Sequence, residues 1–125
     1  MFENTKAFSG FAVPDIAAAK RFYGETLGLR VSEPAESVLT LHLAGGRDTL
    51  VYHKPDFTPA TYTILNFAVD DVERAVDELS ARGVEFERYD GFDQDEKGIM
   101  RNQGPDIAWF TDPAGNILAV IGEDA

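Results

Sequence analysis

The chain has 125 residues, of which 44% are hydrophobic and 11% aromatic, enough for one folded domain with a sizeable core. Its 11 Lys and Arg residues stand against 22 Asp and Glu, and the net charge of −11 argues against nucleic acid or an anionic membrane surface as a partner. The absence of Cys excludes disulfides and thiolate chemistry, and the lack of a signal-peptide pattern or an apolar run of roughly 20 residues predicts a cytoplasmic protein.

The first elements are predicted between Phe11 and Val31. An apolar strand leads to Asp15, which can cap a helix that begins at Ile16. Gly28 stands where the helix ends, and a second strand follows it. The predicted helix has one apolar face, made by Ile16, Ala19, Tyr23 and Leu27.

A hairpin is predicted next, over residues 37–54, with two alternating strands around a Gly-Gly turn. The alternation directs Leu39, Leu41 and Leu43 toward the helices. Thr40 and His42 then lie on the opposite face, and Leu50 and Tyr52 are expected there as well.

The order then repeats from Phe67 to Glu87, where Phe67-Ala-Val aligns with Phe11-Ala-Val. Asp70 or Asp71 can cap a helix that begins at Val72, and a further strand is expected after a glycine stop. The apolar face of this helix is predicted to hold Val72, Ala75, Val76 and Leu79. A last hairpin, 107–122, turns at the sequence Asp-Pro-Ala-Gly-Asn, residues 112–116.

The chain therefore reads as two tandem βαβββ modules, about 6–54 and about 61–122, in a single α+β domain spanning 1–125. We expect a curved mixed sheet with the helices on its outer face. Its concave face would form a pocket, the default place for a ligand.

This pattern resembles the vicinal oxygen chelate superfamily of glyoxalases, bleomycin-resistance proteins and extradiol dioxygenases. The resemblance covers nearly the whole chain and rests on the double βαβββ order and three segments. These are "FYGETLGL" (22–29), "VDDVERAVDELSARGV" (69–84) and "DPAGN" (112–116). It implies a homodimer, as in many members, with the modules paired within one chain or between chains.

Metalloenzymes of this superfamily hold a divalent metal with His, Glu or Gln at equivalent strand positions of the two modules. The matching positions here are Phe8, Leu50, Ile64 and Ala119. These four side chains are apolar and carry no group that binds a cation. A one-residue shift of the alignment brings in no His, Asp or Glu. The resemblance therefore implies a member without the metal site, and we predict neither a metal nor another cofactor.

The predicted pocket is an aromatic wall with a few polar groups, typical of a small-molecule site. An apolar or aromatic ligand is expected. The acidic net charge also suits a cationic ligand, and the alternative is that the charge serves solubility alone. A histidine satisfied within the protein and a Trp in the core are the alternatives for His42 and Trp109. The predicted ligand-binding residues are Phe8, Thr40, His42, Tyr52, Tyr62, Ile64, Asn66, Met100 and Trp109.

The segment from Arg88 to Pro105 has no counterpart in the first module. It is either a lid over the pocket or a solvated connection. As a lid, it would bring Met100 to an apolar ligand, and Lys97 or Arg101 to an anionic one.

Three functions remain open. We favour a metal-independent small-molecule-binding protein, similar to the bleomycin-resistance members that bind or sequester a compound. The second is a glyoxalase-like lyase or isomerase, or a dioxygenase-related enzyme, acting on a small carbonyl or aromatic compound. There, His42 or a tyrosine would serve as acid or base, because no nucleophile–base pair can be assembled from the sequence. The third is a metalloenzyme with displaced ligands, such as His42 with carboxylates from the 88–105 segment.

Overall fold

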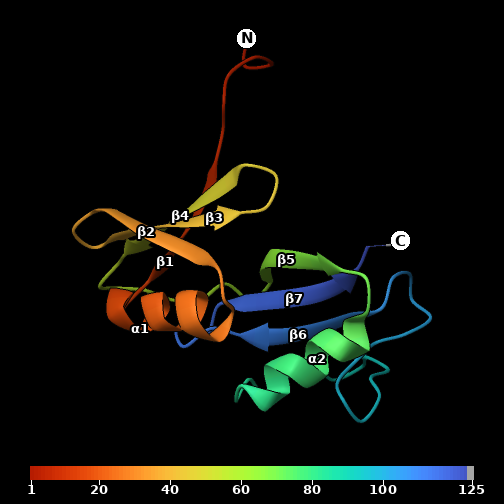
Figure 1. The fold of residues 1–125 in the computed structure, drawn as a ribbon. Helices are drawn as coiled ribbons and strands as arrows, with labels where there is room; N and C mark the ends of the chain where they lie inside the picture. The colour runs from red at the N-terminus through yellow and green to blue at the C-terminus, as the bar shows by residue number, and fades with distance from the viewer. Residues whose placement is uncertain (124–125) are drawn as a thin grey trace. The chain divides into compact units, whose positions relative to one another are not determined.

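A computed structural model gives the fold and describes residues 1–123 (Figure 1). The last two residues of the expected 1–125 domain lie outside the described residues. The chain divides into two compact units, unit 1 from Met1 to Phe57 and unit 2 from Thr58 to Ala125. This division falls in the segment between the two predicted modules.

Unit 1 contains one four-stranded sheet in the order β1-β4-β3-β2. Strand β1 runs parallel to β4, and the β4–β3 and β3–β2 pairs are antiparallel. The sheet is therefore mixed, as the sequence predicted. Its elements are β1 (Ser9–Val13), α1 (Ile16–Arg21), η1 (Phe22–Thr26), β2 (Arg30–Ala35), β3 (Val38–Leu43) and β4 (Arg47–His53).

The helical part of unit 1 begins at its predicted cap. The Asp15 carboxylate accepts a hydrogen bond from the Ala18 N–H at 3.0 Å. One regular helix was expected through Leu27, but the chain changes after Arg21 to a π-helix, in which Leu27 N–H donates to the Phe22 carbonyl at 2.9 Å. This wider turn keeps Tyr23 fully buried, and Gly28 then ends the helix with a positive φ of 72°.

The core of unit 1 lies between its helix and one face of its sheet. Leu39 and Leu41 are completely buried, as the strand alternation predicted, and α1 contacts β3 and β4. Val51 is buried on the same face, and Val31 faces the helical turn at Gly24. The intervening residues of each strand therefore lie on the face turned away from the helix.

Unit 2 contains a three-stranded sheet in the order β5-β7-β6, with β5 parallel to β7 and β7 antiparallel to β6. Asp71, and not Asp70, caps α2, because its carboxylate accepts the Arg74 N–H at 3.0 Å. Val72 and Val76 of the predicted apolar face are buried. The elements are β5 (Thr63–Val69), α2 (Val72–Ala81), β6 (Ile107–Thr111) and β7 (Ile117–Gly122).

Unit 2 lacks one strand that the repeat predicted. After Gly83 the chain forms isolated antiparallel bridges to β6 and no regular strand: Phe86 pairs with Phe110 and Met100 with Ile107, and the Glu87 N–H donates to the Trp109 carbonyl at 2.8 Å. Beyond that point the backbone leaves the edge of β6, because residues 87–99 make a local loop with their own hydrogen bonds. The second half therefore has three regular strands, and isolated bridges stand where the repeat predicted the fourth strand of the βαβββ module.

The turn between β6 and β7 forms as predicted. The Asp112 carboxylate accepts the Ala114 N–H at 3.0 Å and the Asn116 N–H at 2.8 Å. Gly115 has a φ of 93°, the left-handed conformation that favours glycine. Both Asp112 and Asn116 are buried, so the turn is a rigid end of the sheet. No helix in residues 1–123 combines the length and apolar character needed to span a bilayer.

Candidate functional site

The face of the unit 1 sheet that turns away from α1 carries four of the predicted residues. Thr40 and His42 lie there on β3, and Tyr52 lies there on β4. Phe8, directly before β1, falls on the same face by strand alternation. Phe8 is 72% exposed and Tyr52 41% exposed, so two aromatic rings are open to solvent on this face.

His42 makes hydrogen bonds on both sides of its ring. Its Nε2 lies 2.8 Å from the Ser32 Oγ of β2, and its Nδ1 lies 3.2 Å from the Asp48 carboxylate of β4. The sheet register supports both contacts, because His42 pairs with Asp48 across β3–β4 and Ser32 pairs with Thr40 across β2–β3. A hydroxyl, an imidazole and a carboxylate are thus aligned across three adjacent strands, an arrangement that can relay a proton.

The corresponding face of the unit 2 sheet carries the other predicted strand residues. Asn66 of β5 and Trp109 of β6 both pair with Ala119 of β7, so the three lie in one row across the sheet. Ile64 is half-buried in β5, and Tyr62, just before that strand, is 69% exposed. Asn66 is exposed, although its neighbours in β5 are apolar.

Trp109 is buried in an aromatic cluster that the sequence did not predict. Its ring centroid lies 5.5 Å from that of Tyr89 and 5.2 Å from that of Phe92, and the Tyr89 and Phe92 rings are 5.6 Å apart. Phe92 remains 46% exposed. The Tyr89 hydroxyl is buried without a hydrogen-bond partner among the described residues. Desolvation, followed by the nearby charge of Glu87, raises the pKa of Tyr89, so this group is a neutral hydrogen-bond donor.

The segment after Glu87 is a loop held by its own hydrogen bonds, and not a simple solvated connection. Gln94 holds it from inside, accepting the Tyr89 N–H at 2.8 Å and donating to the Glu87 and Gly98 carbonyls at 2.9 and 2.8 Å. Arg88 donates to the carbonyls of Asp95, at 2.6 Å, and Glu96. These bonds explain how Tyr89 and Phe92 are held against the Trp109 ring.

Asp95 organises the second half of this loop. Partial burial raises the pKa of its carboxyl, but the N–H groups of Ile99 and Lys97, together with Arg101, outweigh that effect and hold the pKa below its ordinary value. Ile99 is fully buried next to it. Met100, a predicted ligand contact, is half-buried, and its backbone exchanges hydrogen bonds with Ile107 at the edge of β6.

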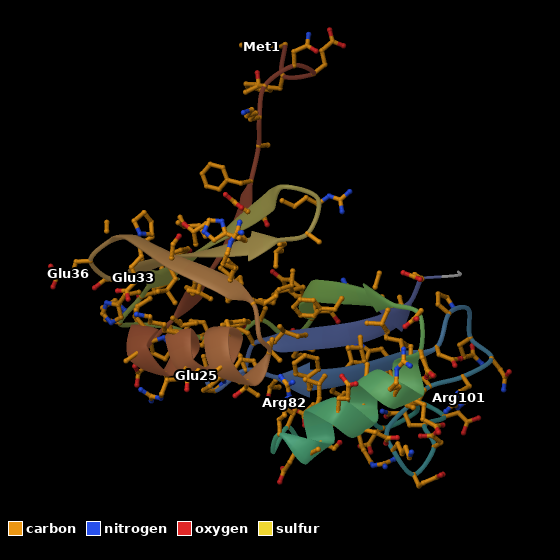
Figure 2. The ribbon with its side chains drawn as sticks, viewed as in Figure 1. Met1, Glu25, Glu33, Glu36, Arg82 and Arg101 are labelled. Atoms are coloured by element: carbon orange, nitrogen blue, oxygen red, sulfur yellow. The ribbon has the colours of Figure 1, made fainter. Side chains whose placement is uncertain are left out.

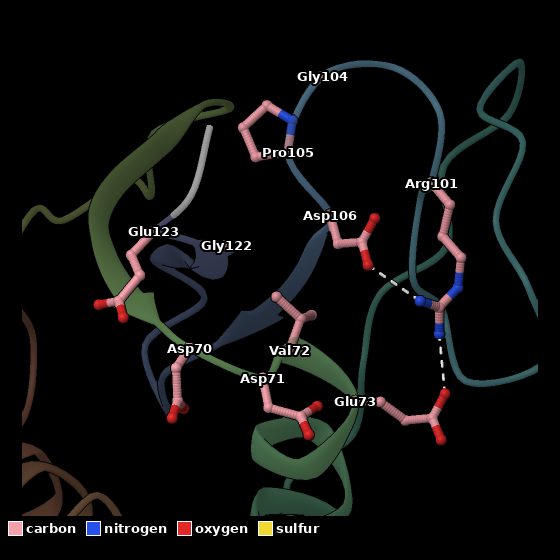
Figure 3. A pocket seen from close by; sticks show the side chains of 10 residues that line it. All are labelled: Asp70, Asp71, Val72, Glu73, Arg101, Gly104, Pro105, Asp106, Gly122 and Glu123. Carbon is pink, nitrogen blue, oxygen red and sulfur yellow. Dashed lines mark hydrogen bonds and ion pairs between the residues drawn. The ribbon is translucent and has the colours of Figure 1, made fainter.

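A pocket of about 400 Å³ lies at the N-terminal end of α2, within unit 2 (Figure 3). Arg101 crosses one side of it and pairs with Glu73 at 2.9 Å and Asp106 at 2.9 Å. Figure 2 places Arg101 on the loop beside α2. The expected role of Arg101 or Lys97 toward an anionic ligand gains no support, because Lys97 also pairs with a carboxylate, that of Asp77 at 2.9 Å. The pocket residues are Asp70, Asp71, Val72, Glu73, Arg101, Gly104, Pro105, Asp106, Gly122 and Glu123.

The four positions at which the family resemblance implied metal ligands hold the apolar residues Phe8, Leu50, Ile64 and Ala119. Phe8 is exposed, whereas Ala119 is fully buried in the centre of the unit 2 sheet. Within residues 1–123, no three His, Cys, Asp or Glu side chains gather closely enough to hold a metal ion.

Sequence reasoning missed four residues that complete these two faces, namely Ser32, Asp48, Tyr89 and Phe92. The signal for Asp48 was present, since a three-residue turn at 44–46 places it opposite His42. Ser32 had no such signal, because a register shift between Ser32 and Ala35 alters the pairing of β2 with β3. Tyr89 and Phe92 reach Trp109 only through the loop fold.

The fold defines a class of proteins built from two tandem α+β modules, each with a helix covering one face of a small mixed sheet. Residues 7–120 match the profile of the Glyoxalase/Bleomycin resistance protein/Dioxygenase superfamily. The chain belongs to this superfamily, as its resemblance to the vicinal oxygen chelate proteins predicted.

Solved structures share the fold at low sequence identity. A protein assigned to the glyoxalase family from Bacillus anthracis has a TM-score of 0.72 at 20% identity, covering 98% of each chain. A glyoxalase/dioxygenase from Nostoc punctiforme has a TM-score of 0.68 at 18% identity, covering 97% of this chain and 92% of that one. TnmS3, an antibiotic binding protein from Streptomyces sp. CB03234, has a TM-score of 0.66 at 23% identity, with 95% and 97% covered. Among curated protein sequences, none matches significantly.

Proposed function

We propose that this chain is a metal-independent protein that binds a small apolar or aromatic molecule through the sheet faces turned away from its helices. The observation that carries the proposal is the exposure of three aromatic side chains predicted to line a ligand wall: Phe8, Tyr52 and Tyr62 are 72%, 41% and 69% exposed. Large aromatic rings are usually withdrawn from water, so the exposure of Phe8 and Tyr52 on one face of the unit 1 sheet, and of Tyr62 in unit 2, supports ligand binding at these rings. The antibiotic-binding relative with the same fold supports this choice of function.

Metal independence rests on the side chains at the four positions where related enzymes hold their ligands. Phe8, Leu50, Ile64 and Ala119 offer no oxygen, nitrogen or thiolate to a cation. The proposed binding therefore uses burial of apolar area and aromatic stacking, which need no ion. Ligand affinity is expected to be the same with and without a chelator.

Titration calorimetry against a panel of planar aromatic compounds tests the proposal, and saturable binding to at least one compound is expected. Phe8→Ala should then weaken binding about tenfold, because loss of one aromatic contact costs roughly 1.4 kcal/mol. Phe2→Ala is the matched control, since Phe2 is 73% exposed but lies outside the predicted wall. Absence of binding to every compound, or equal losses in the two variants, would contradict the proposal.

We also propose that the protein forms a homodimer, which the family resemblance implies. The exposed apolar side chains of the N-terminal segment, Met1, Phe2 and Phe8, support it, because a second chain can cover such groups. Figure 2 shows Met1 at the end of a segment that extends away from the unit 1 sheet. Sedimentation equilibrium at several concentrations measures the assembly, and a constant monomer mass would contradict it.

A further inference from the structure

We propose that Ser32, His42 and Asp48 form a hydrolytic site, in which Ser32 is a nucleophile toward activated esters. The Ser32 Oγ lies 2.8 Å from His42 Nε2, and the opposite ring nitrogen, Nδ1, lies 3.2 Å from the Asp48 carboxylate. These are the two contacts that nucleophilic catalysis by a hydroxyl requires: a base within reach of the hydroxyl, and a third group that orients the base. This activity goes beyond the proposed ligand binding, although it uses His42 and Tyr52 of the same sheet face, because binding alone requires no nucleophile.

The two contacts of the His42 ring suit one of its tautomers. A carboxylate accepts hydrogen bonds, so in the catalytic tautomer the Nδ1 proton points to Asp48. Nε2 then carries the free lone pair, and the Ser32 hydroxyl donates its proton to it. The resting state therefore already has the direction of proton transfer that activates Ser32.

Two features of the sheet hold Ser32 in place. The register of β2 shifts between Ser32 and Ala35, so that Glu33 and Pro34 together face the single residue Leu39 of β3. Such bulges re-aim side chains and are frequent next to active sites. Glu33 is also tied to Lys20 of α1 by an ion pair. Ser32 itself is exposed, and the His42 side chain is only 26% exposed, so the nucleophile is accessible while its base is held.

The neighbourhood indicates an ester with an apolar or aromatic alcohol. Leu50 and Tyr52 follow Asp48 at two-residue intervals on the same face of β4, and Tyr52 is 41% exposed. Arg30 pairs with His42 in the sheet register and precedes Ser32 by two residues, so it places positive charge on the face where an oxyanion would form.

The reaction needs water as its only co-reactant. Ser32 Oγ bonds to the ester carbonyl carbon as its proton passes to His42 Nε2. The bond from that carbon to the leaving oxygen then breaks, and the leaving oxygen takes the proton from Nε2 and departs as the alcohol. Water next attacks the acyl carbon and gives a proton to Nε2. The carboxylic acid is released as that proton returns to the Ser32 oxygen. Asp48 is a positioning residue throughout.

The test measures release of 4-nitrophenolate from 4-nitrophenyl acetate by the full-length protein. A second assay is covalent labelling with a fluorophosphonate probe, in which mass spectrometry identifies the labelled residue. Wild type should hydrolyse the ester and carry the label on Ser32. Ser32→Ala and His42→Gln should each lower hydrolysis about a hundredfold, the usual contribution of a positioned base. Ser9→Ala is the matched control in the same sheet, because its hydroxyl contacts Thr49 and no histidine.

Asp48→Asn should lower kcat with KM unchanged, because the substitution alters the His42 tautomer and not the apolar contacts. Circular dichroism establishes that each variant is folded. Absence of a label on wild-type Ser32 overturns the proposal, and so does equal labelling after His42→Gln. Ester hydrolysis that survives Ser32→Ala assigns the activity to the imidazole alone and overturns the nucleophilic role of Ser32.

Discussion

At the scale of single residues, the Tyr89 hydroxyl has the clearest energetic consequence. It is buried and has no hydrogen-bond partner among the described residues, and such a group costs about 1 kcal/mol or more when it is withdrawn from water. Tyr89→Phe keeps the ring contacts with Trp109 and Phe92 and removes only the oxygen. The free energy of unfolding, measured in urea, should therefore rise by about 1 kcal/mol.

The control for this prediction is Tyr62→Phe, because Tyr62 is 69% exposed and its hydroxyl is solvated. That variant should change the free energy of unfolding by less than about 0.5 kcal/mol. A loss of stability in Tyr89→Phe would show that the hydroxyl finds a partner in solution.

Some contacts between single residues could be predicted from the sequence and others could not. Asp48 opposite His42 follows from the length of one turn, so this half of the candidate hydrolytic site was within reach. Ser32 was not, because its register depends on a bulge that has no local sequence signal. The packing of Tyr89 on Trp109 spans 20 residues and requires the whole intervening loop, as the hydrogen bonds of Gln94 show. Such long-range contacts cannot be predicted from local residue patterns.

At the scale of secondary-structure elements, two adjacent carboxylates at the N-terminus of α2 have different roles. Asp71 caps the helix by accepting the Arg74 N–H, whereas Asp70 makes only an exposed ion pair with the Arg74 side chain at 3.4 Å. Asp71→Ala should lower the free energy of unfolding by about 1 kcal/mol, since it leaves a helix donor unsatisfied. Asp70→Ala should cost less than about 0.5 kcal/mol. Chemical denaturation of both variants measures the difference, and equal losses would contradict the assigned cap.

The helices, their caps and both hairpins were predictable because each depends on local chemistry. The Asp-Pro-Ala-Gly-Asn turn formed as expected, with the Asp112 carboxylate as the acceptor for its N–H groups. The predictions failed where an element departs from its repeat. The π-helix at Phe22–Thr26 and the isolated bridges that replace a regular strand after Gly83 both depend on tertiary packing, around Tyr23 in one unit and along β6 in the other.

At the scale of the whole molecule, family membership defines the fold but not the ligand. The superfamily profile covers residues 7–120, yet the four positions at which the resemblance implied metal ligands are apolar in this chain. The features of this chain that bear on ligand choice are therefore the exposed aromatic rings, the polar cluster of His42 and the acidic charge. The first two are local features, and the charge is a property of all 125 residues.

The net charge of −11 leads to a prediction about ligand choice. Two aromatic probes of equal shape, one with a trimethylammonium group and one with a neutral tert-butyl group, bury the same apolar area. The cation should bind more tightly at low salt, because the field of an acidic protein attracts positive charge. Its advantage should shrink as ionic strength rises from about 0.01 to 0.15 M, where the screening length falls from roughly 30 to 8 Å. Affinity for the neutral probe should barely change over that range. Calorimetric titrations at the two salt concentrations measure both affinities, and an equal salt response for the two probes would mean that the acidic charge serves solubility alone.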